Sequence, residues 1–108
     1  MPKFIAIGYG DRAGYDRTTA AVRTAAHAHD DYLKQHGAVI GIAGNPVQVR
    51  NPDDAGIQTI DTAFMSASLP VAGFSVIEAA DISEAVGLVS RTPCAVAHGV
   101  VEVRPIKE

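Results

Sequence analysis

The fold is decided by the last third of the chain, where residues 71–79 read VAGFSVIEA and residues 99–106 read GVVEVRPI. Both stretches are rich in β-branched residues and predict strands. Between them, residues 81–92 carry apolar side chains at helical spacing, with Asp81 or Ser83 as the expected cap. This half of the chain therefore predicts a β-α-β unit, which defines an architecture and only weakly a function.

The first half predicts the same order of elements. Lys3–Tyr9 is apolar on both sides and predicts a central strand, and a helix capped by Asp16 or Thr18 should end at Gly37. One stripe of this helix is apolar, with His29 at its centre. The residues expected to point away from that stripe are Arg23, His27, Asp30 and Lys34.

The middle of the chain is rich in turn-forming residues. A second strand is expected at Ala38–Ala43, followed by a hairpin that pairs Val47–Arg50 with Ile57–Ile60 around residues 51–56. The small residues 65–70 then predict a connector to the third main strand.

The order β-α-β, hairpin, β-α-β predicts one α+β domain over residues 1–108, with a ferredoxin-like antiparallel sheet and two helices on one face. The other face is expected to be apolar too, because Ile5 and Ile7 must point away from the helices if Phe4 and Ala6 face them. An uncovered apolar face of this size needs a partner, and the economical partner is a second copy. The sequence therefore predicts a homodimer whose sheets pack face to face.

Composition and charge narrow the classes of partner. The chain is 47% hydrophobic and 19% charged with a net charge of -3, which is typical of a soluble globular protein. It has no basic stripe with interleaved aromatic residues, so a nucleic-acid partner is not expected. The apolar start, Met1–Ile7, is too short for a signal peptide or a membrane span, so no membrane partner is expected either. A single cysteine, Cys94, indicates a reducing compartment, so we expect a cytoplasmic protein in which Cys94 is a buried structural thiol.

His29 is the leading candidate for catalysis. An imidazole can act as a general base near neutral pH if a carboxylate orients it and substrate reaches it. The alternative is a core histidine with one backbone hydrogen bond. Asp11 and Asp61 are the candidate carboxylates because both are expected at loop ends, where each could equally be a turn or cap residue.

Ligand binding has a second set of candidates. Tyr9 or Arg104 could hold an anionic molecule, with Asp11 nearby at the end of the first strand. Glu102 and Arg104 should share a sheet face with Val100, and the alternative role for this pair is an ion pair that fixes the register of the dimer.

Metal and cofactor sites are not predicted. His27 and His29 point in different directions on one helix and cannot hold one ion together, while His29 and His36 lie two turns apart. The glycines at 8 and 10 do not form a dinucleotide fingerprint.

A resemblance to a known family adds to these expectations. The positions that carry it are Asp61, Phe64, Gly73, Phe74, Ile77–Ala79, Glu84, Ala85, Pro93 and Gly99–Pro105. Together they resemble the YCII-related family, specifically its DGPF subgroup, over nearly the whole chain. The resemblance implies a dimeric α+β barrel of ferredoxin-like subunits. In some relatives a histidine on the first helix is thought to act with an aspartate just before the proline that ends the second helix.

This chain matches that pattern in part. His29 stands at the histidine position, whereas Thr92 stands at the aspartate position. Thr62 and Ala63 replace the Gly-Pro of the subgroup's motif. We therefore expect a small dimeric protein that binds a small organic ligand or acts as an accessory module. The alternative is an enzyme of lyase or dehalogenase type that uses His29 as general base.

Overall fold

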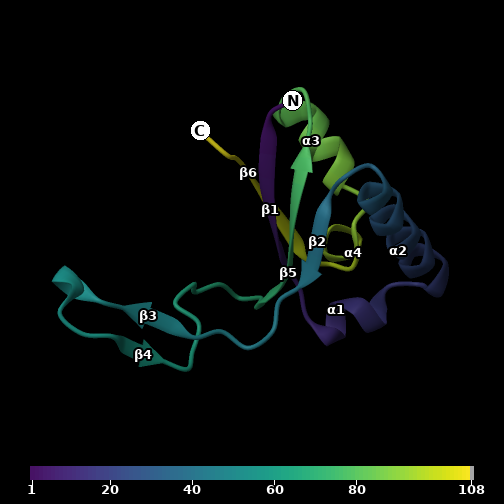
Figure 1. Cartoon of the computed structure of the whole chain (residues 1–108). Coiled ribbons are helices and arrows are strands. Elements are labelled where there is room, and N and C mark those ends of the chain that lie inside the picture. The colour runs from purple at the N-terminus through teal and green to yellow at the C-terminus, as the bar shows by residue number, and fades with distance from the viewer. Residues whose placement is uncertain (108) are drawn as a thin grey trace.

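A computed structural model describes residues 1–107 of the chain. In chain order its elements are β1 (Lys3–Tyr9), α1 (Arg12–Arg17), α2 (Ala20–Gln35), β2 (Val39–Ile42), β3 (Gln48–Arg50), the 3-10 helix η1 (Pro52–Asp54), β4 (Gln58–Ile60), β5 (Val71–Glu78), α3 (Ile82–Val89), α4 (Pro93–Val96) and β6 (Val100–Pro105). The α-helices gather on one side of the main sheet (Figure 1).

The main sheet has the strand order β2-β5-β1-β6, and each neighbouring pair is antiparallel. β1 is a central strand, as its apolar residues on both faces predicted. Ala6 lies opposite Ser75 of β5 on one side and Val103 of β6 on the other. The α+β class with an antiparallel sheet is therefore confirmed.

The face of the sheet toward the helices carries the core. Phe4 and Ala6 of β1 and Ile77 of β5 are buried there, together with Ala85 and Val89 of α3. Ala85 is fully buried, and its small side chain lets α3 approach the sheet closely. The core therefore lies between the sheet and α3.

The short helix α3 begins where the sequence predicted. Asp81 accepts a hydrogen bond from the backbone N–H of Glu84 at 2.8 Å, and the Glu84 carboxylate accepts one from the N–H of Ala80 at 3.2 Å. This is a capping box that satisfies two N–H groups left free at the helix start. Of the two expected caps, Asp81 is confirmed.

The predicted long helix is α2, but neither Asp16 nor Thr18 caps it, so both predicted caps are wrong; a separate short helix, α1, precedes it. Thr18 is extended, and its hydroxyl donates to the carbonyl of Gly14 at 2.9 Å, which closes α1. Thr19 is extended as well and caps α2. The predicted end is confirmed, because Gly37 follows the helix with a φ of 94°, which glycine adopts without steric cost.

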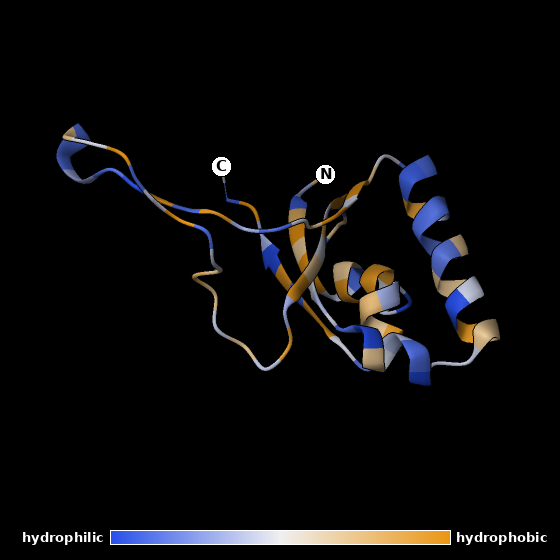
Figure 2. Ribbon diagram, turned by 90° about the horizontal axis from the view of Figure 1, so that it is seen from below, coloured by the Kyte–Doolittle hydropathy of each residue, from blue (hydrophilic) through white to orange (hydrophobic). Residues whose placement is uncertain are grey.

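The predicted hairpin is confirmed, with Val49 opposite Thr59. Within residues 1–107, β3 and β4 form a two-stranded sheet separate from the main one. We call residues 44–70, which comprise this hairpin and the connector after it, the arm. Figures 1 and 2 both show the arm running out from the main sheet on the side away from α2.

The second face of the main sheet has no helix on it in these views. Val101 and Val103 pack against the core, so the alternating residues Val100, Glu102 and Arg104 point to the second face. That Glu102 and Arg104 share a face with Val100 is therefore confirmed. We call this surface the open face. Its exposed apolar residues are Val39, Phe74 and Val100. No helix within residues 1–107 combines the length and the apolar character needed to cross a membrane.

Candidate functional site

A cavity of about 890 Å³ lies between α2 and the main sheet. The helix α4 lies between α2 and the strands and keeps them apart (Figure 1). Ile40, Ile42 and Val101 contribute apolar side chains to the sheet wall. The cavity is thus bordered by side chains of the sheet on this side.

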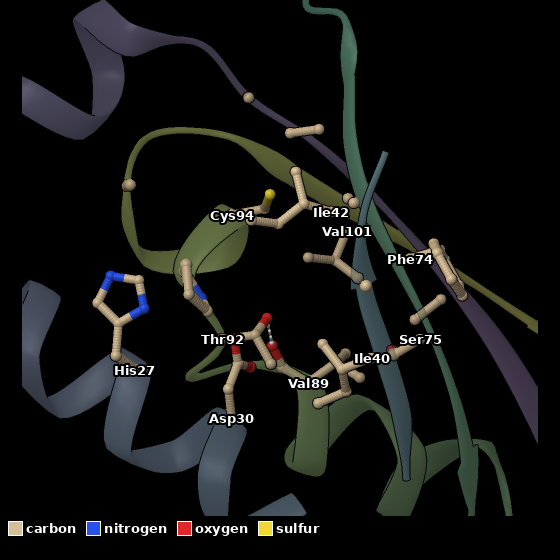
Figure 3. Close-up of a pocket in the computed structure, with 18 of the residues that line it drawn as sticks. His27, Asp30, Ile40, Ile42, Phe74, Ser75, Val89, Thr92, Cys94 and Val101 are labelled. Carbon is tan, nitrogen blue, oxygen red and sulfur yellow. Dashed lines mark hydrogen bonds between the residues drawn. The ribbon is translucent and has the colours of Figure 1, made fainter. Parts of the chain in front are cut away.

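The opposite wall is a polar stripe of α2. His27, Asp30, Asp31 and Lys34 line the cavity, and their spacing of three, four and seven residues places them on one face of the helix. In Figure 3, His27 and Asp30 rise from α2 on one side, and the strand residue Ile40 lies on the other. His27, Asp30 and Lys34 do point away from the stripe that carries His29, as predicted, and their side of α2 borders this cavity.

The short helix α1 forms one rim of the cavity. Asp11 lines the rim and accepts a hydrogen bond from the N–H of Gly14 at 2.8 Å, so this candidate carboxylate serves as the helix cap. The Tyr15 hydroxyl lies 3.0 Å from Nε2 of His27, and the guanidinium of Arg23 lies 4.9 Å from the centre of the Tyr15 ring. These contacts fix α1 to α2 at the mouth of the cavity.

Asp30 is the half-buried acid of the helix wall. Burial raises the pKa of its carboxyl above the ordinary value of 3.8, and the positive charges of His27 and Lys34 partly oppose this. No ion pair among residues 1–107 includes Asp30. A carboxylate in this position gains from a ligand that brings a positive charge or an N–H group.

Cys94 lies on the first turn of α4 and contributes to the cavity lining. A Cβ at Gly8 would lie 2.8 Å from its sulfur, so the glycine provides the room that the thiol needs. Burial raises the pKa of the Cys94 thiol, and the nearby Asp30 charge adds to this effect. The thiol is half-buried and protonated at neutral pH, which agrees with its predicted lack of nucleophilic character.

His29, the leading catalytic candidate, does not line this cavity. Its side chain is 8% exposed, and Nε2 donates a hydrogen bond to the backbone carbonyl of Leu88 in α3. The ring also stacks on Tyr32, with ring centres 5.9 Å apart. His29 thus connects α2 to α3, and its ring nitrogen is used in a structural hydrogen bond.

The other predicted site residues are dispersed. Asp61 directly follows β4 in the arm, and Figure 1 shows this hairpin far from α2, so the structure does not bring Asp61 and His29 together. Arg104 and Glu102 pair with each other at 3.4 Å on the open face. Tyr9, at the end of β1, lines a second hollow at the root of the arm.

Thr92, which stands at the aspartate position of the resemblance, does line the main cavity. Its hydroxyl donates to the carbonyl of Val89 at 2.6 Å, the hydrogen bond drawn in Figure 3. A hydroxyl held in this way supplies neither charge nor a general base. The described residues also bring together no group of three or more His, Cys, Asp or Glu side chains that could hold a metal ion.

His27 and Asp30 are the site residues that the sequence argument missed. A signal for them was present, because the apolar stripe of α2 includes Ala25 and Ala26, whose small side chains fill little of the space above a sheet. A long helix with so little bulk on its inner side leaves a gap unless another segment enters. Here α4 enters part of it, and the polar residues of α2 border the rest.

A search against protein-family models finds no match for this chain, and a search of curated proteins finds none either.

Proposed function

We propose that this chain binds a small organic molecule in the cavity between α2 and the sheet. The proposed ligand has a compact apolar body and one positively charged or hydrogen-bond-donating group. The observation that carries the proposal is Asp30, a half-buried carboxylate without an ion-pair partner among the described residues, in a cavity with an apolar far wall. The cavity volume lies within the range of about 300–1,000 Å³ typical of small-molecule sites.

The charges of the rim favour a cationic ligand. Arg12 is already paired with Asp16 at 3.3 Å, while Asp30 and Asp31 face the cavity without such a partner. A ligand ammonium group beside Asp30 would offset the cost of burying the carboxylate. Lys34, one turn further along α2, would instead favour an anion, so the choice of ligand charge is the point to test.

The experiment compares three ligands with the same apolar body, carrying an amine, an alcohol or a carboxylate. We expect the amine to bind at least about tenfold more tightly than the alcohol, because a hydrogen bond to a charged group contributes roughly 1.5–3 kcal/mol. Asp30→Asn should remove this preference. Asp53→Asn, which makes the same change of charge at an exposed position outside the cavity, is the matched control.

Two results would contradict the proposal. One is tightest binding of the carboxylate, and the other is equal amine affinity for wild type and Asp30→Asn. Amine binding should also weaken as the pH falls through the pKa of Asp30, because the protonated acid no longer attracts the cation.

The assembly and the family also remain proposals. The strand order β2-β5-β1-β6, with helices on one face, supports a ferredoxin-like subunit. The exposed apolar residues of the open face support the predicted homodimer, in which two such sheets pack together as a dimeric α+β barrel. Both agree with the resemblance to the YCII-related family and its DGPF subgroup. The cytoplasmic location stays a prediction.

The alternative function, an enzyme with His29 as general base, has less support. A general base must reach the proton that it removes, and His29 is buried with Nε2 bonded to Leu88. The imidazole that lines the cavity is His27. A lyase or dehalogenase activity would therefore require a movement of α2 that frees His29.

A further inference from the structure

The hairpin of the arm has two unlike faces. The pairing of Val49 with Thr59 places these two on one face, and Ile57 falls on the same side by alternation. The other face carries the polar residues Gln48, Arg50, Gln58 and Thr62 with Ile60, and the Gln48 amide donates to the Thr62 hydroxyl at 3.0 Å. The apolar face is uncovered, because Val49 is 65% and Ile57 74% exposed. Figure 2 shows these apolar stretches along the extended arm.

A two-stranded hairpin with one uncovered apolar face is only marginally stable in water. Its strands need a third layer or a further strand to bury that face. Within residues 1–107, β3 and β4 pair with each other and the main sheet does not continue onto them. The arm therefore has the chemistry of a segment that packs against something outside its own chain.

The dimensions of the chain indicate how much surface a partner would bury. Its radius of gyration is 15.6 Å, whereas a compact domain of this length has about 13 Å. Its accessible surface is 7366 Å², against about 5,700 Å² for a compact monomer of this mass. The excess of roughly 1,600 Å² per chain, buried from both sides, falls within the 2,000–5,000 Å² of obligate homodimers.

The direction of the arm identifies the partner. In Figures 1 and 2 the arm runs out on the side of the main sheet away from α2, which is the side of the open face. A second copy stacked on the open face would lie beside the arm. At the root of the arm, a hollow of about 930 Å³ lined by Val47, Val49, Phe64, Met65 and Leu69 gives this side a concave apolar surface.

We infer that the arm is a dimer clasp, in which the apolar face of each arm packs on a second copy of this chain stacked against the open face. This inference rests on the homodimer proposed above and adds the element that holds it. In a two-fold dimer each subunit would extend one arm and receive one, so every contact is made twice. Ligand binding in the cavity does not depend on it.

The test measures the dimer dissociation constant of four variants by sedimentation over a dilution series. Val49→Asp and Ile57→Asp place a charge on the apolar face and should each weaken the dimer at least about tenfold. Gln58→Asp adds the same charge to the polar face and should change the dimer dissociation constant less than about threefold. Phe74→Asp tests the open face itself. The arm substitutions replace exposed side chains, so the subunit should stay folded, which circular dichroism checks.

Hydrogen exchange of the backbone amides in β3 and β4 gives an independent measure. They should be protected in the dimer and lose that protection on dilution, because a free hairpin opens readily. If Phe74→Asp abolishes the dimer while Val49→Asp and Ile57→Asp leave its dissociation constant unchanged, the clasp is refuted. The homodimer through the open face would still be supported. Equal weakening by Gln58→Asp would also overturn it. A wild type that stays monomeric throughout would refute clasp and dimer together, while the amine series still tests ligand binding separately.

Discussion

Strands of the main sheet and of the arm both alternate apolar and polar residues, but the apolar side chains are buried in the main sheet and exposed in the arm. Phe4, on the inner face of β1, is 4% exposed, whereas Phe64 in the arm is 76% exposed. The difference comes from what lies above each ring. The helix α3 packs over the face that carries Phe4, whereas Phe64, beyond the end of β4, has the Arg50 guanidinium 5.6 Å from its ring centre and no helix over it in Figure 1. Alternation tells which residues share a face, and only the rest of the fold decides whether that face is buried.

The largest expected effect compares one substitution in the two regions. Phe4→Ala should reduce the free energy of unfolding by about 3–5 kcal/mol, because it leaves a cavity in the core. Phe64→Ala in a dilute solution should change it by less than about 0.5 kcal/mol. Urea unfolding measures both.

Repeating the two measurements at rising protein concentration sharpens the comparison. If the arm packs on a second copy, the cost of Phe64→Ala should grow with concentration, since unfolding then includes dissociation. The contrast between sheet and arm would be refuted if Phe64→Ala cost as much as Phe4→Ala in the dilute protein.

A smaller effect separates two histidines of α2. His29→Ala should destabilise the protein by roughly 1–3 kcal/mol, because it leaves the partly buried Leu88 carbonyl without its donor. His27→Ala, at an exposed position on the cavity wall, should change amine affinity instead. Thermal unfolding and ligand titration of both variants check this. Loss of an activity in His29→Ala without loss of stability would favour the enzyme alternative.

The smallest effect concerns Asp30. Its folded-state pKa is raised by burial, so the protonated form is favoured in the folded protein. Below pH 3.8 the carboxyl is protonated in both states, and as the pH rises the unfolded chain ionises first, which lowers stability until the folded carboxyl has ionised too. Asp30→Asn should therefore match wild type at low pH and be slightly more stable at pH 7.

The group is only half-buried, so we expect a gain of about 0.5 kcal/mol or less. Melting temperatures of the two proteins measured across pH 3 to 7 detect it, with Asp53→Asn, at an exposed position outside the cavity, as the control. A variant that was less stable than wild type at pH 7 would mean that the charged carboxylate has a stabilising partner.

Much of the main sheet could be predicted because the apolar and polar pattern of each strand indicates which of its faces are covered. β1 is apolar on both faces, and β5 and β6 alternate, so their place in an antiparallel α+β sheet follows from pattern alone. Asp81 and Gly37 likewise mark their helix ends by local chemistry. The break between α1 and α2 could not be foreseen, since it depends on whether Thr18 or Thr19 ends or begins a helix.

The cavity could not be predicted from the pattern of α2. The polar side of α2 was expected to face solvent because helical periodicity separates apolar from polar residues without saying what lies opposite each. Asp30 meets Ile40 across a cavity because α4 holds the helix off the sheet, and α4 spans only four residues. A turn that short has too few residues to show a period.

The room that Gly8 leaves for Cys94 has a practical consequence. Cys94 is the single cysteine of the chain, and it lines the cavity, so one thiol-reactive dye would label each molecule at one position beside the bound molecule. Because burial raises the pKa of the thiol, labelling should be slow at neutral pH and faster in mildly alkaline buffer. An environment-sensitive fluorophore at this position would turn the protein into an optical sensor for whatever displaces water from the cavity.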